Sequence, residues 1–558
     1  MLPRLGPPAA ILLLSGPILA GLAGTILPAF GYLPALGGQD LSLEPLRRLA
    51  AAPGIAGSTM LSFQAGLASA VLSLGVVMLL VAAWAGTPAF SRVQHLISPL
   101  LSVPHAAAAF GFAFLIAPSG LVARLLSPEI TGWQRPPDLL IVNDPMGLSL
   151  IAGLVVKEIP FLLLVTLAAL PQVPLARTRE LAASLGYGRI AGFFCCLWPP
   201  LYRQIRLPVF AVIAFASSVV DVAIILGPST PPTLAVRVIG WMNDPELSMR
   251  FLASAGALLQ LGITAAAILA WLVLERLGAI VLQTLSIHGL RLRRDGALRM
   301  LALALTLAGA LAVFVGLAGL ALWSVAGLWQ FPDALPRGVS LKTWVATAPR
   351  VAEPLATTLV AGLVSTAAAL VLTLLCLMRE DETGRRPRRA AALIYLPLIV
   401  PQAAFLFGLH LLFLLGGVDA SLWALVLVHL VFVMPYVFLS LSDPWRAFDR
   451  RYEAIAAGLG KSRLETLWRV RLPMLARPVL TACAVGFAVS VGLYLPTVLI
   501  GAGRLTTITT EAVALASGGN RRVIGVYAFL QMLLPLAGFA VATVVPALLF
   551  RRFRAMRV

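Results

Sequence analysis

The sequence predicts an all-α integral membrane protein of about 12 transmembrane helices, built as two parallel six-helix repeats. Three observations lead to this fold class. The 558 residues are 60% apolar and only 12% charged, which is not the composition of a soluble globular protein. Apolar runs of about 18–25 residues recur throughout, whereas the strands of a membrane β-barrel alternate over about ten residues. Finally, a polar motif in the first half of the chain returns in the second.

The predicted spans are the apolar runs, each long enough to cross a hydrocarbon core of about 30 Å as a helix. In the first half they are 8–30, 60–84, 97–117, 146–170, 209–227 and 250–275. In the second half they are 299–325, 354–378, 392–415, 421–442, 479–500 and 524–550.

The net charge of +19 reflects membrane topology rather than a nucleic-acid partner. If both termini are cytoplasmic, roughly 29 of the 42 Lys and Arg residues fall on the inner side of the membrane, as the positive-inside rule requires. The densest clusters are Arg385, Arg386, Arg388 and Arg389, and then Arg551, Arg552, Arg554 and Arg557 after the last span. We therefore predict a multi-pass protein of a bacterial inner membrane, with both termini in the cytoplasm and no nucleic-acid partner.

The repeat is seen when the chain is shifted on itself so that Gly186 falls on Gly460. Gly186 stands thirteen residues before Pro199, and Gly460 stands thirteen residues before Pro473. Six spans is an even number, so a tandem duplication keeps the same orientation in both copies. We predict a first half at 1–275 with an inner loop at 171–208, a linker at 276–298, and a second half at 299–558 with an inner loop at 443–478. A transport path is expected between the halves.

Each inner loop reads as a short Ala-rich helix, a glycine turn, and a basic and aromatic strip that returns to the membrane. Such an element can insert into a groove on a partner protein, or it can simply rest on lipid headgroups. Its recurrence at equivalent places favours docking. The docking candidates are Glu180, Ala182, Ala183, Gly186, Arg189, Phe193 and Pro199, and then Glu453, Ala456, Ala457, Gly460, Lys461, Leu472 and Pro473.

These loops resemble the "EAA" loop of permease subunits in bacterial ATP-binding-cassette (ABC) importers. The family pattern of Glu-Ala-Ala, three residues, Gly, and a basic run to Leu-Pro maps onto Glu180, Ala182, Gly186, Phe193 and Pro199, and onto Glu453, Ala456, Gly460, Val470, Leu472 and Pro473. There are departures: Leu181 replaces the first Ala, Trp198 replaces Leu, and Glu453 lies one residue early, with Ala454 at the Glu position. The fused two-half form is similar to importer permeases of the ferric-iron, thiamine and sulfate-related group. The segment from Pro496-Thr497 through Glu511 to Gly519 is similar to that of YnjC-type permeases.

The resemblance implies two partners, a cytoplasmic ATPase dimer docked on the two loops and a periplasmic solute-binding protein. The chain itself has no Gly-x-x-x-x-Gly-Lys-Ser/Thr phosphate loop, so ATP hydrolysis is expected in a separate subunit. The chain is then a translocator of a small polar solute, not an enzyme. No cofactor or metal site is predicted, because the four Cys and five His show no ligand spacing. Two alternatives remain, a 12-span secondary transporter and a membrane-embedded enzyme.

Five polar residues within or beside the spans are candidates for a pathway or gate. Lys157 and Glu158 are adjacent charges inside the fourth span, and Asp221 in the fifth span can approach Lys157 from a packed neighbour. Charges are costly in lipid, so these residues form either a structural ion pair or part of a path. His105 after Pro104 and Gln402 after Pro401 take matching positions in the two halves, which points to a central cavity.

Overall fold

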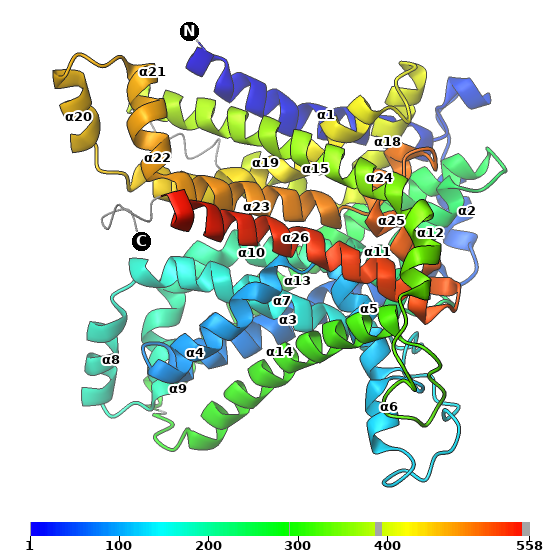
Figure 1. The fold of residues 1–558 in the computed structure, drawn as a ribbon, viewed down its shortest axis with the longest axis horizontal. Helices are drawn as coiled ribbons and strands as arrows, with labels where there is room; N and C mark the ends of the chain where they lie inside the picture. Colours follow the sequence, from blue (N-terminus) through cyan, green and yellow to red (C-terminus); the bar gives the residue numbers. More distant parts are fainter. Residues whose placement is uncertain (1, 290, 385–392, 550–558) are drawn as a thin grey trace.

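Long helices run side by side along the longest axis of the molecule (Figure 1). The computed structural model describes residues 2–289, 291–384 and 393–549. The two predicted arginine clusters, at 385–389 and 551–557, lie outside these residues. The long helices of the first half are α1 (Gly6–Ala29), α3 (Ile55–Trp84), α5 (His105–Ile116), α7 (Leu148–Ala169), α10 (Trp198–Ser218) and α13 (Met249–Ile287). Those of the second half are α14 (Gly296–Val325), α15 (Lys342–Thr383), α18 (Gln402–Leu415), α19 (Leu422–Arg446), α23 (Ala476–Gly492) and α26 (Arg521–Leu549).

Shorter helices connect the long ones at both ends of the bundle. In the first half they are α2 (Glu44–Ala51), α4 (Pro88–Ile97), α6 (Leu121–Leu126), α8 (Leu175–Ser184), α9 (Arg189–Gly192), α11 (Asp221–Leu226) and α12 (Leu234–Met242). In the second half they are α17 (Leu396–Ile399), α20 (Arg451–Gly458), α21 (Arg463–Thr466), α22 (Leu472–Met474), α24 (Leu495–Gly501) and α25 (Ile508–Ala514). Short 3₁₀ helices lie at Leu2–Arg4, Pro34–Leu36, Ser98–Ser102, Leu170–Gln172 and Leu515–Ser517, and π-helices at Phe193–Leu197 and Leu467–Arg471.

The all-α membrane fold is confirmed, but the number of full spans is smaller than predicted. Within the described residues, nine helices are long and apolar enough to cross a membrane, or ten if 463–474 and 476–492, bent by 78°, form one span. The remaining predicted spans fall short for physical reasons. Helix α18 has 14 residues and so rises only about 21 Å. Helix α10 ends at Ser218, and its first turns carry Arg203 and Arg206, which leaves a short apolar stretch.

The first helix of each half packs against the third helix of the other half. Helix α1 lies along α18, where Gly24 meets Gly408, and α14 lies along α5, where Gly316 meets Gly111. A Cβ added at Gly316 would lie 2.6 Å from the carbonyl carbon of Gly111, so only glycine permits this backbone approach. The backbone N–H of Gly408 also donates to the Thr25 hydroxyl at 3.1 Å. The two halves are thus interlocked rather than merely adjacent.

The same contacts recur in the two halves. The Leu234 N–H that opens α12 donates to Ser62 Oγ on α3 at 2.9 Å, and the Ile508 N–H that opens α25 donates to Thr358 Oγ1 on α15 at 3.0 Å. The step in numbering from Leu234 to Ile508 equals the step from Gly186 to Gly460, which we call the repeat offset. The step from Ser62 to Thr358 is longer, because the first half carries the long segment 118–145 after its third span. Helices α2 and α3 together therefore correspond to the single helix α15.

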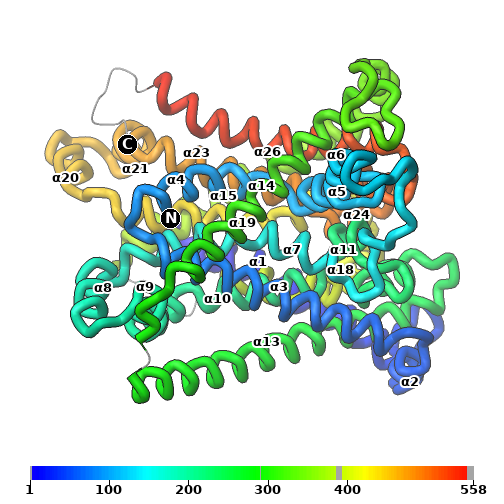
Figure 2. The backbone as a smooth tube through the Cα atoms, turned by 90° about the horizontal axis from the view of Figure 1, so that it is seen from below, coloured from blue at the N-terminus to red at the C-terminus, as the bar shows by residue number. Residues whose placement is uncertain are grey.

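Two loops project at one end of the bundle. Figure 2 shows α8 with α9 and α20 with α21 at this end, and α1 begins and α26 ends there too. The opposite end carries α2 and α6.

Candidate functional site

The first loop turns through a left-handed glycine. Helix α8 ends at Ser184, and Gly186 follows with φ of +79°, a conformation that glycine adopts without the steric cost of a side chain. The Gly186 N–H donates to Ala183 O at 2.9 Å and the Tyr187 N–H to Ala182 O at 3.0 Å, so the last carbonyls of the helix are satisfied. The chain then re-enters a helix at Arg189.

The second loop repeats this turn with the same bonds. Gly460 has φ of +75°, its N–H donates to Ala457 O at 2.9 Å, and the Lys461 N–H donates to Ala456 O at 3.0 Å. Every donor and acceptor is related to its counterpart in the first loop by the repeat offset. The sequence repeat is therefore also a repeat of backbone geometry.

Each loop returns to the bundle through a π-helix followed by a proline. The repeat offset also relates the two π-helices, Phe193–Leu197 and Leu467–Arg471. Pro199 and Pro473 each take the second position of the next helix. A proline has no backbone N–H, so neither residue donates to the carbonyl four residues earlier. The Gly-to-Pro spacing thus marks a unit of turn, short helix and π-helix, which we call the loop module, at 175–199 and 451–473.

The helix before each glycine turn, α8 in the first module and α20 in the second, buries one alanine. Large apolar side chains are exposed as a pair on its other face. Ala182 and Ala456 are both 5% exposed, and Ala182 lies against Gly192 of α9 within its own module. The outer face of the first module shows Leu181 and Leu185, 59% and 51% exposed, and that of the second shows Ile455 and Leu459, 61% and 73% exposed. The docking candidates predicted from the sequence do not include these pairs. The repeat offset relates them and was the signal that could have found them.

The remaining candidates divide between the outer face and the contact with the bundle. Ala183, Glu180 and Arg189 are exposed in the first module, and Ala457 and Lys461 in the second. Phe193 is buried, whereas Leu472 and Pro473 are half-buried.

Arginines hold the first module to the end of α3. The Arg179 guanidinium donates to Ala82 O at 3.2 Å and also to Ala85 O, and Arg189 donates to Ala83 O at 3.0 Å. These carbonyls belong to the last turn of α3 and the residue after it, where helical carbonyls lack partners and the helix dipole favours a cation. Burial, together with the charge of Arg189, lowers the pKa of Arg179.

An ion-pair network holds the second module to the end of α15. Arg471 Nη1 lies 2.7 Å from Asp381 Oδ2 and 2.8 Å from Glu453 Oε1. The same guanidinium donates to Trp445 O at 3.1 Å and stacks 3.7 Å from the centre of the Trp445 ring. Its side chain is only 7% exposed. Glu453 is therefore turned inward, while Glu180 stays exposed, so the one-residue shift between the two copies places the two Glu side chains differently.

The segment between the halves completes the first module. The Gly188 N–H donates to Arg291 O at 2.8 Å, and the Ile190 N–H donates to Asp295 Oδ2 at 3.0 Å, which caps α9. In the second module Ser462 stands at the position of Gly188, and its own hydroxyl accepts from the Glu465 N–H at 3.2 Å. The second module thus caps itself, and the first relies on 291–295.

The intramembrane charges pair differently from the prediction. Glu158 Oε1 lies 3.2 Å from His105 Nε2, and the Lys157 ammonium donates to Leu100 O at 2.9 Å. No Lys157–Asp221 ion pair occurs in the described part of the chain, because the lysine extends to a backbone carbonyl of the preceding segment instead. Asp221 opens α11, is buried, and interacts electrostatically with His105.

Two tyrosines from the second half approach the same group. Tyr436 interacts electrostatically with Glu158, and Tyr494 with Asp221. Gln402 takes the first position of α18, as His105 does in α5. Within the described residues no hydrogen bond joins Gln402 to Glu158, whose ion pair is with His105. We call Glu158, His105, Asp221, Tyr436 and Tyr494 the central polar group, and it joins both halves of the chain.

Comparison with known proteins gives the family. The inner membrane ABC transporter permease protein YnjC of Escherichia coli is 34% identical over 506 residues, which cover 90% of this chain and 91% of that protein. The chain belongs to the ABC transporter permease family. The model of the family described as "Binding-protein-dependent transport system inner membrane component" matches residues 383–555, a stretch that includes the second loop module.

Partial matches to other permeases agree. The spermidine/putrescine transport system permease protein PotC of Haemophilus influenzae is 26% identical over 119 residues, 21% of this chain and 46% of that protein. The molybdenum transport system permease protein ModB of Mycobacterium tuberculosis is 31% identical over 150 residues, 23% of this chain and 57% of that protein. As an ABC permease the chain is an inner-membrane transport subunit and not an enzyme, and its family works with ATPase and solute-binding subunits.

Proposed function

We propose that the two loop modules dock the two subunits of a cytoplasmic ATPase dimer. The observation that carries this proposal is the recurrence of one folded module at one end of the bundle, with an exposed apolar pair at matching places. Leu181 with Leu185, and Ile455 with Leu459, are spaced i, i+4, so each pair lies on one face of its helix. Each exposed apolar pair can insert into a hydrophobic groove, and a partner with two subunits offers two such grooves.

The modules are built to transmit motion. Each runs through its π-helix directly into helices of the bundle, α10 in the first half and α22 with α23 in the second. Arg179 and Arg189 fix the first module to the cytoplasmic end of α3, and Arg471 fixes the second to that of α15. Closure of the ATPase pair would move both modules together and switch the bundle between inward-facing and outward-facing states.

The solute is a small polar one, delivered by a periplasmic binding protein, and it passes between the halves beside the central polar group. His105 is 36% exposed while its partner Glu158 is 4% exposed, so this group borders an accessible space. The named substrates of the relatives PotC and ModB support small polar solutes as the class. Replacement of Glu158 by Gln should lower the rate of uptake while the amount of protein in the membrane stays the same.

The boundaries of the two halves follow from the same repeat. The first half is 1–275, the linker is 276–298, and the second half is 299–558. Both termini are cytoplasmic, because α1 begins and α26 ends at the end that carries the loop modules (Figure 1). A reporter enzyme active only in the cytoplasm, fused to either terminus, should be active.

The docking proposal is tested with double variants of the exposed pairs. The chain is reconstituted in nanodiscs, and its affinity for the ATPase subunit of its transport system is measured. Leu181→Asp with Leu185→Asp, or Ile455→Asp with Leu459→Asp, should weaken binding by roughly tenfold or more, since each buried apolar side chain contributes about 1.5–3 kcal/mol. Leu41→Asp is the matched control, because Leu41 is 73% exposed at the opposite end.

Unchanged affinity in both double variants would contradict docking through these faces. Uptake driven by an ion gradient through this chain alone would contradict ATPase-driven transport, and vesicles with and without ATP distinguish the two.

A further inference from the structure

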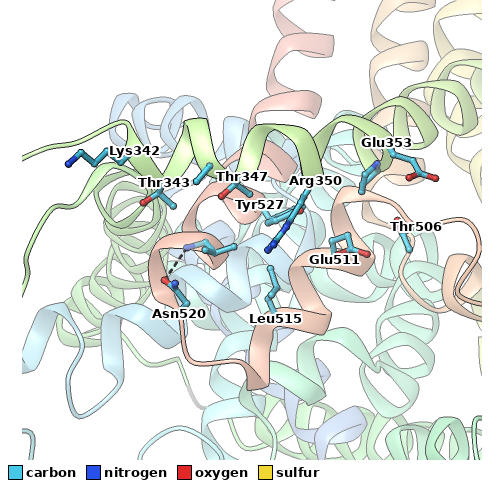
Figure 3. Close-up of a pocket in the computed structure, with 13 residues that line it drawn as sticks. Lys342, Thr343, Thr347, Arg350, Glu353, Thr506, Glu511, Leu515, Asn520 and Tyr527 are labelled. Atoms are coloured by element: carbon cyan, nitrogen blue, oxygen red, sulfur yellow. Dashed lines mark hydrogen bonds between the residues drawn. The ribbon is translucent and has the colours of Figure 1, made fainter.

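A pocket of about 760 Å³ lies at the end of the bundle opposite the loop modules, between α15, α25 and α26 (Figure 3). Its wall carries two cations, Lys342 and Arg350, and two carboxylates, Glu353 and Glu511. Figure 3 shows Arg350 reaching from α15 toward Tyr527, with Glu511 across from it on α25. The pocket is of a size that holds small ligands.

The four charged groups do not neutralise one another. None of them takes part in an ion pair within 4.0 Å in the residues that the structure describes. Arg350 and Glu511 both act electrostatically on Tyr527, which is 3% exposed, so charges of opposite sign face one space. Groups of both signs around a single pocket suit a ligand that also carries both signs.

The first half shows that this pocket is not an inevitable gap in the fold. The repeat offset relates Glu511 to Arg237, whose side chain crosses to the residues of the first half that correspond to the α15 wall of the pocket. Arg237 donates to Pro53 O at 2.8 Å and to Ser58 Oγ at 3.3 Å, and stacks 4.9 Å from the centre of the Trp241 ring.

The α15 wall of the pocket also carries charged residues where the matching positions of the first half are uncharged and closely packed. The longer step that relates Ser62 to Thr358 also relates Gly54 to Arg350 and Gly57 to Glu353. A Cβ added at Gly54 or Gly57 would lie 3.3 Å or 2.9 Å from the Pro231 side chain, so these glycines lie close against that proline. In the first half the site is closed by an arginine and a proline. In the second half the same framework is opened and lined with charge.

The depth of the pocket places it at the border of the apolar layer. From Pro354 to Met378, helix α15 contains no charged residue, and Arg350 and Glu353 lie within about one helical turn of the start of that stretch. A group at this level is in reach of lipid headgroups and of solutes outside the membrane.

We propose that this pocket binds a compact zwitterion, with Arg350 holding its phosphate or carboxylate and Glu511 holding its amine. The anion gains charge-assisted hydrogen bonds from the guanidinium, and the ammonium gains them from the carboxylate. Such a ligand comes either from a phosphatidylethanolamine headgroup or from a free solute. The site is separate from the loop modules and does not rest on ATPase docking.

The test uses the full chain in nanodiscs made from phosphatidylglycerol, titrated with soluble glycerophosphoethanolamine in a calorimeter. Binding is expected, and Arg350→Met and Glu511→Gln should each weaken it by roughly 10- to 100-fold, the value of one hydrogen bond to a charged group. Arg135→Met is the matched control, because Arg135 is exposed in the segment between α6 and α7 and does not line the pocket. The unfolding temperature of each variant checks that it is folded.

A second measurement separates the two sources. Native mass spectrometry of the chain released from membranes of mixed composition counts the phosphatidylethanolamine that it retains. If the soluble probe does not bind but Arg350→Met loses the retained phosphatidylethanolamine, the site binds lipid. If the soluble probe binds, a free zwitterion is sufficient. The proposal is overturned if glycerol phosphate or ethanolamine alone binds as tightly, if both variants bind like wild type, or if neither binding nor retention is seen.

Discussion

The loop modules 175–199 and 451–473 share a backbone but not the side chains that hold it. In the first, Arg179 occupies the position that Glu453 occupies in the second, since the repeat offset relates the two. The arginine binds the carbonyls at the end of α3 directly, whereas the glutamate binds Arg471, which reaches Asp381 at the end of α15. A reversal of charge at one position has been accommodated by a new partner, and the geometry of the turn is unchanged.

The caps of the two modules differ in the same way. The N-terminus of α9 is capped by Asp295, from beyond the first half, while α21 is capped by Ser462 within its own module. The first module is thus tied to the segment that joins the halves, and the second is self-contained. The two modules therefore have the same backbone geometry, but mutations at matching positions should change their stability by different amounts.

The largest effect is expected from Arg471→Met. Removal of this buried guanidinium leaves Glu453 without this partner, whereas Asp381 keeps Arg450 at 2.8 Å, so the cost is at most the roughly 3–5 kcal/mol of a fully buried pair. The unfolding temperature of the purified chain should fall, and hydrogen exchange should increase in α20–α22. Arg469→Met is the control, because Arg469 is 73% exposed. Equal loss in the two variants would show that the network carries no special stability.

Arg179→Met should have a smaller effect on the first module. The lost bonds run to neutral carbonyls at a helix end, so no buried charge is stranded, and about 1.5–3 kcal/mol is expected for hydrogen bonds of a charged donor. Hydrogen exchange should increase in α8 and α9 but not in α20. Arg177→Met, an exposed neighbour on the same helix, should leave exchange unchanged. Opening of both modules together would show that they are coupled through the bundle.

Gly186→Ala and Gly460→Ala should each cost about 1–2 kcal/mol, since a side chain is disfavoured at positive φ. The first should cost somewhat more, because a Cβ at Gly186 would lie 3.0 Å from Arg293 Nη2, whereas nothing lies within 4 Å at Gly460. Local hydrogen exchange measures the difference. The opposite order would indicate that the contact with Arg293 relaxes freely.

The smallest effect, about 1 kcal/mol, is expected from removal of a cap. Asp295→Ala should loosen the first module alone, and Ser462→Ala the second alone. The difference between them tests whether 291–295 is a structural part of the first module. If hydrogen exchange at Ile190 is unchanged in Asp295→Ala, then 291–295 is not a structural part of the first module.

The turn itself was accessible from the sequence because it depends on residues close together in the chain. A left-handed position after a short helix calls for glycine, and a proline after the returning strip ends the unit, so Gly186 and Gly460 with Pro199 and Pro473 mark both modules. The anchors were not accessible. Whether a module needs Arg179 or Glu453 depends on what lies beneath it, and Asp381 is 90 residues from Arg471.

The errors of prediction have related causes. Apolar runs locate helices but not their breaks, so α18 and α23 proved shorter than the spans 392–415 and 479–500. The expected Lys157–Asp221 pair fails because a long side chain can reach a carbonyl on another segment, which Leu100 supplies. Conversely, the pairing of Glu158 with His105 joins residues 53 apart whose proximity no local pattern reveals.

The interlocked packing of α1 against α18 also constrains the order in which the protein is made. Thr25 and its partner Gly408 are 383 residues apart. At about 5–20 residues per second, the partner of α1 leaves the ribosome roughly 20–80 s after α1 itself. During that interval the glycine face of α1 has only lipid, or an insertion factor, to rest against. Completion of the first half therefore does not complete its fold, and biogenesis of the bundle ends only when the second half has been inserted.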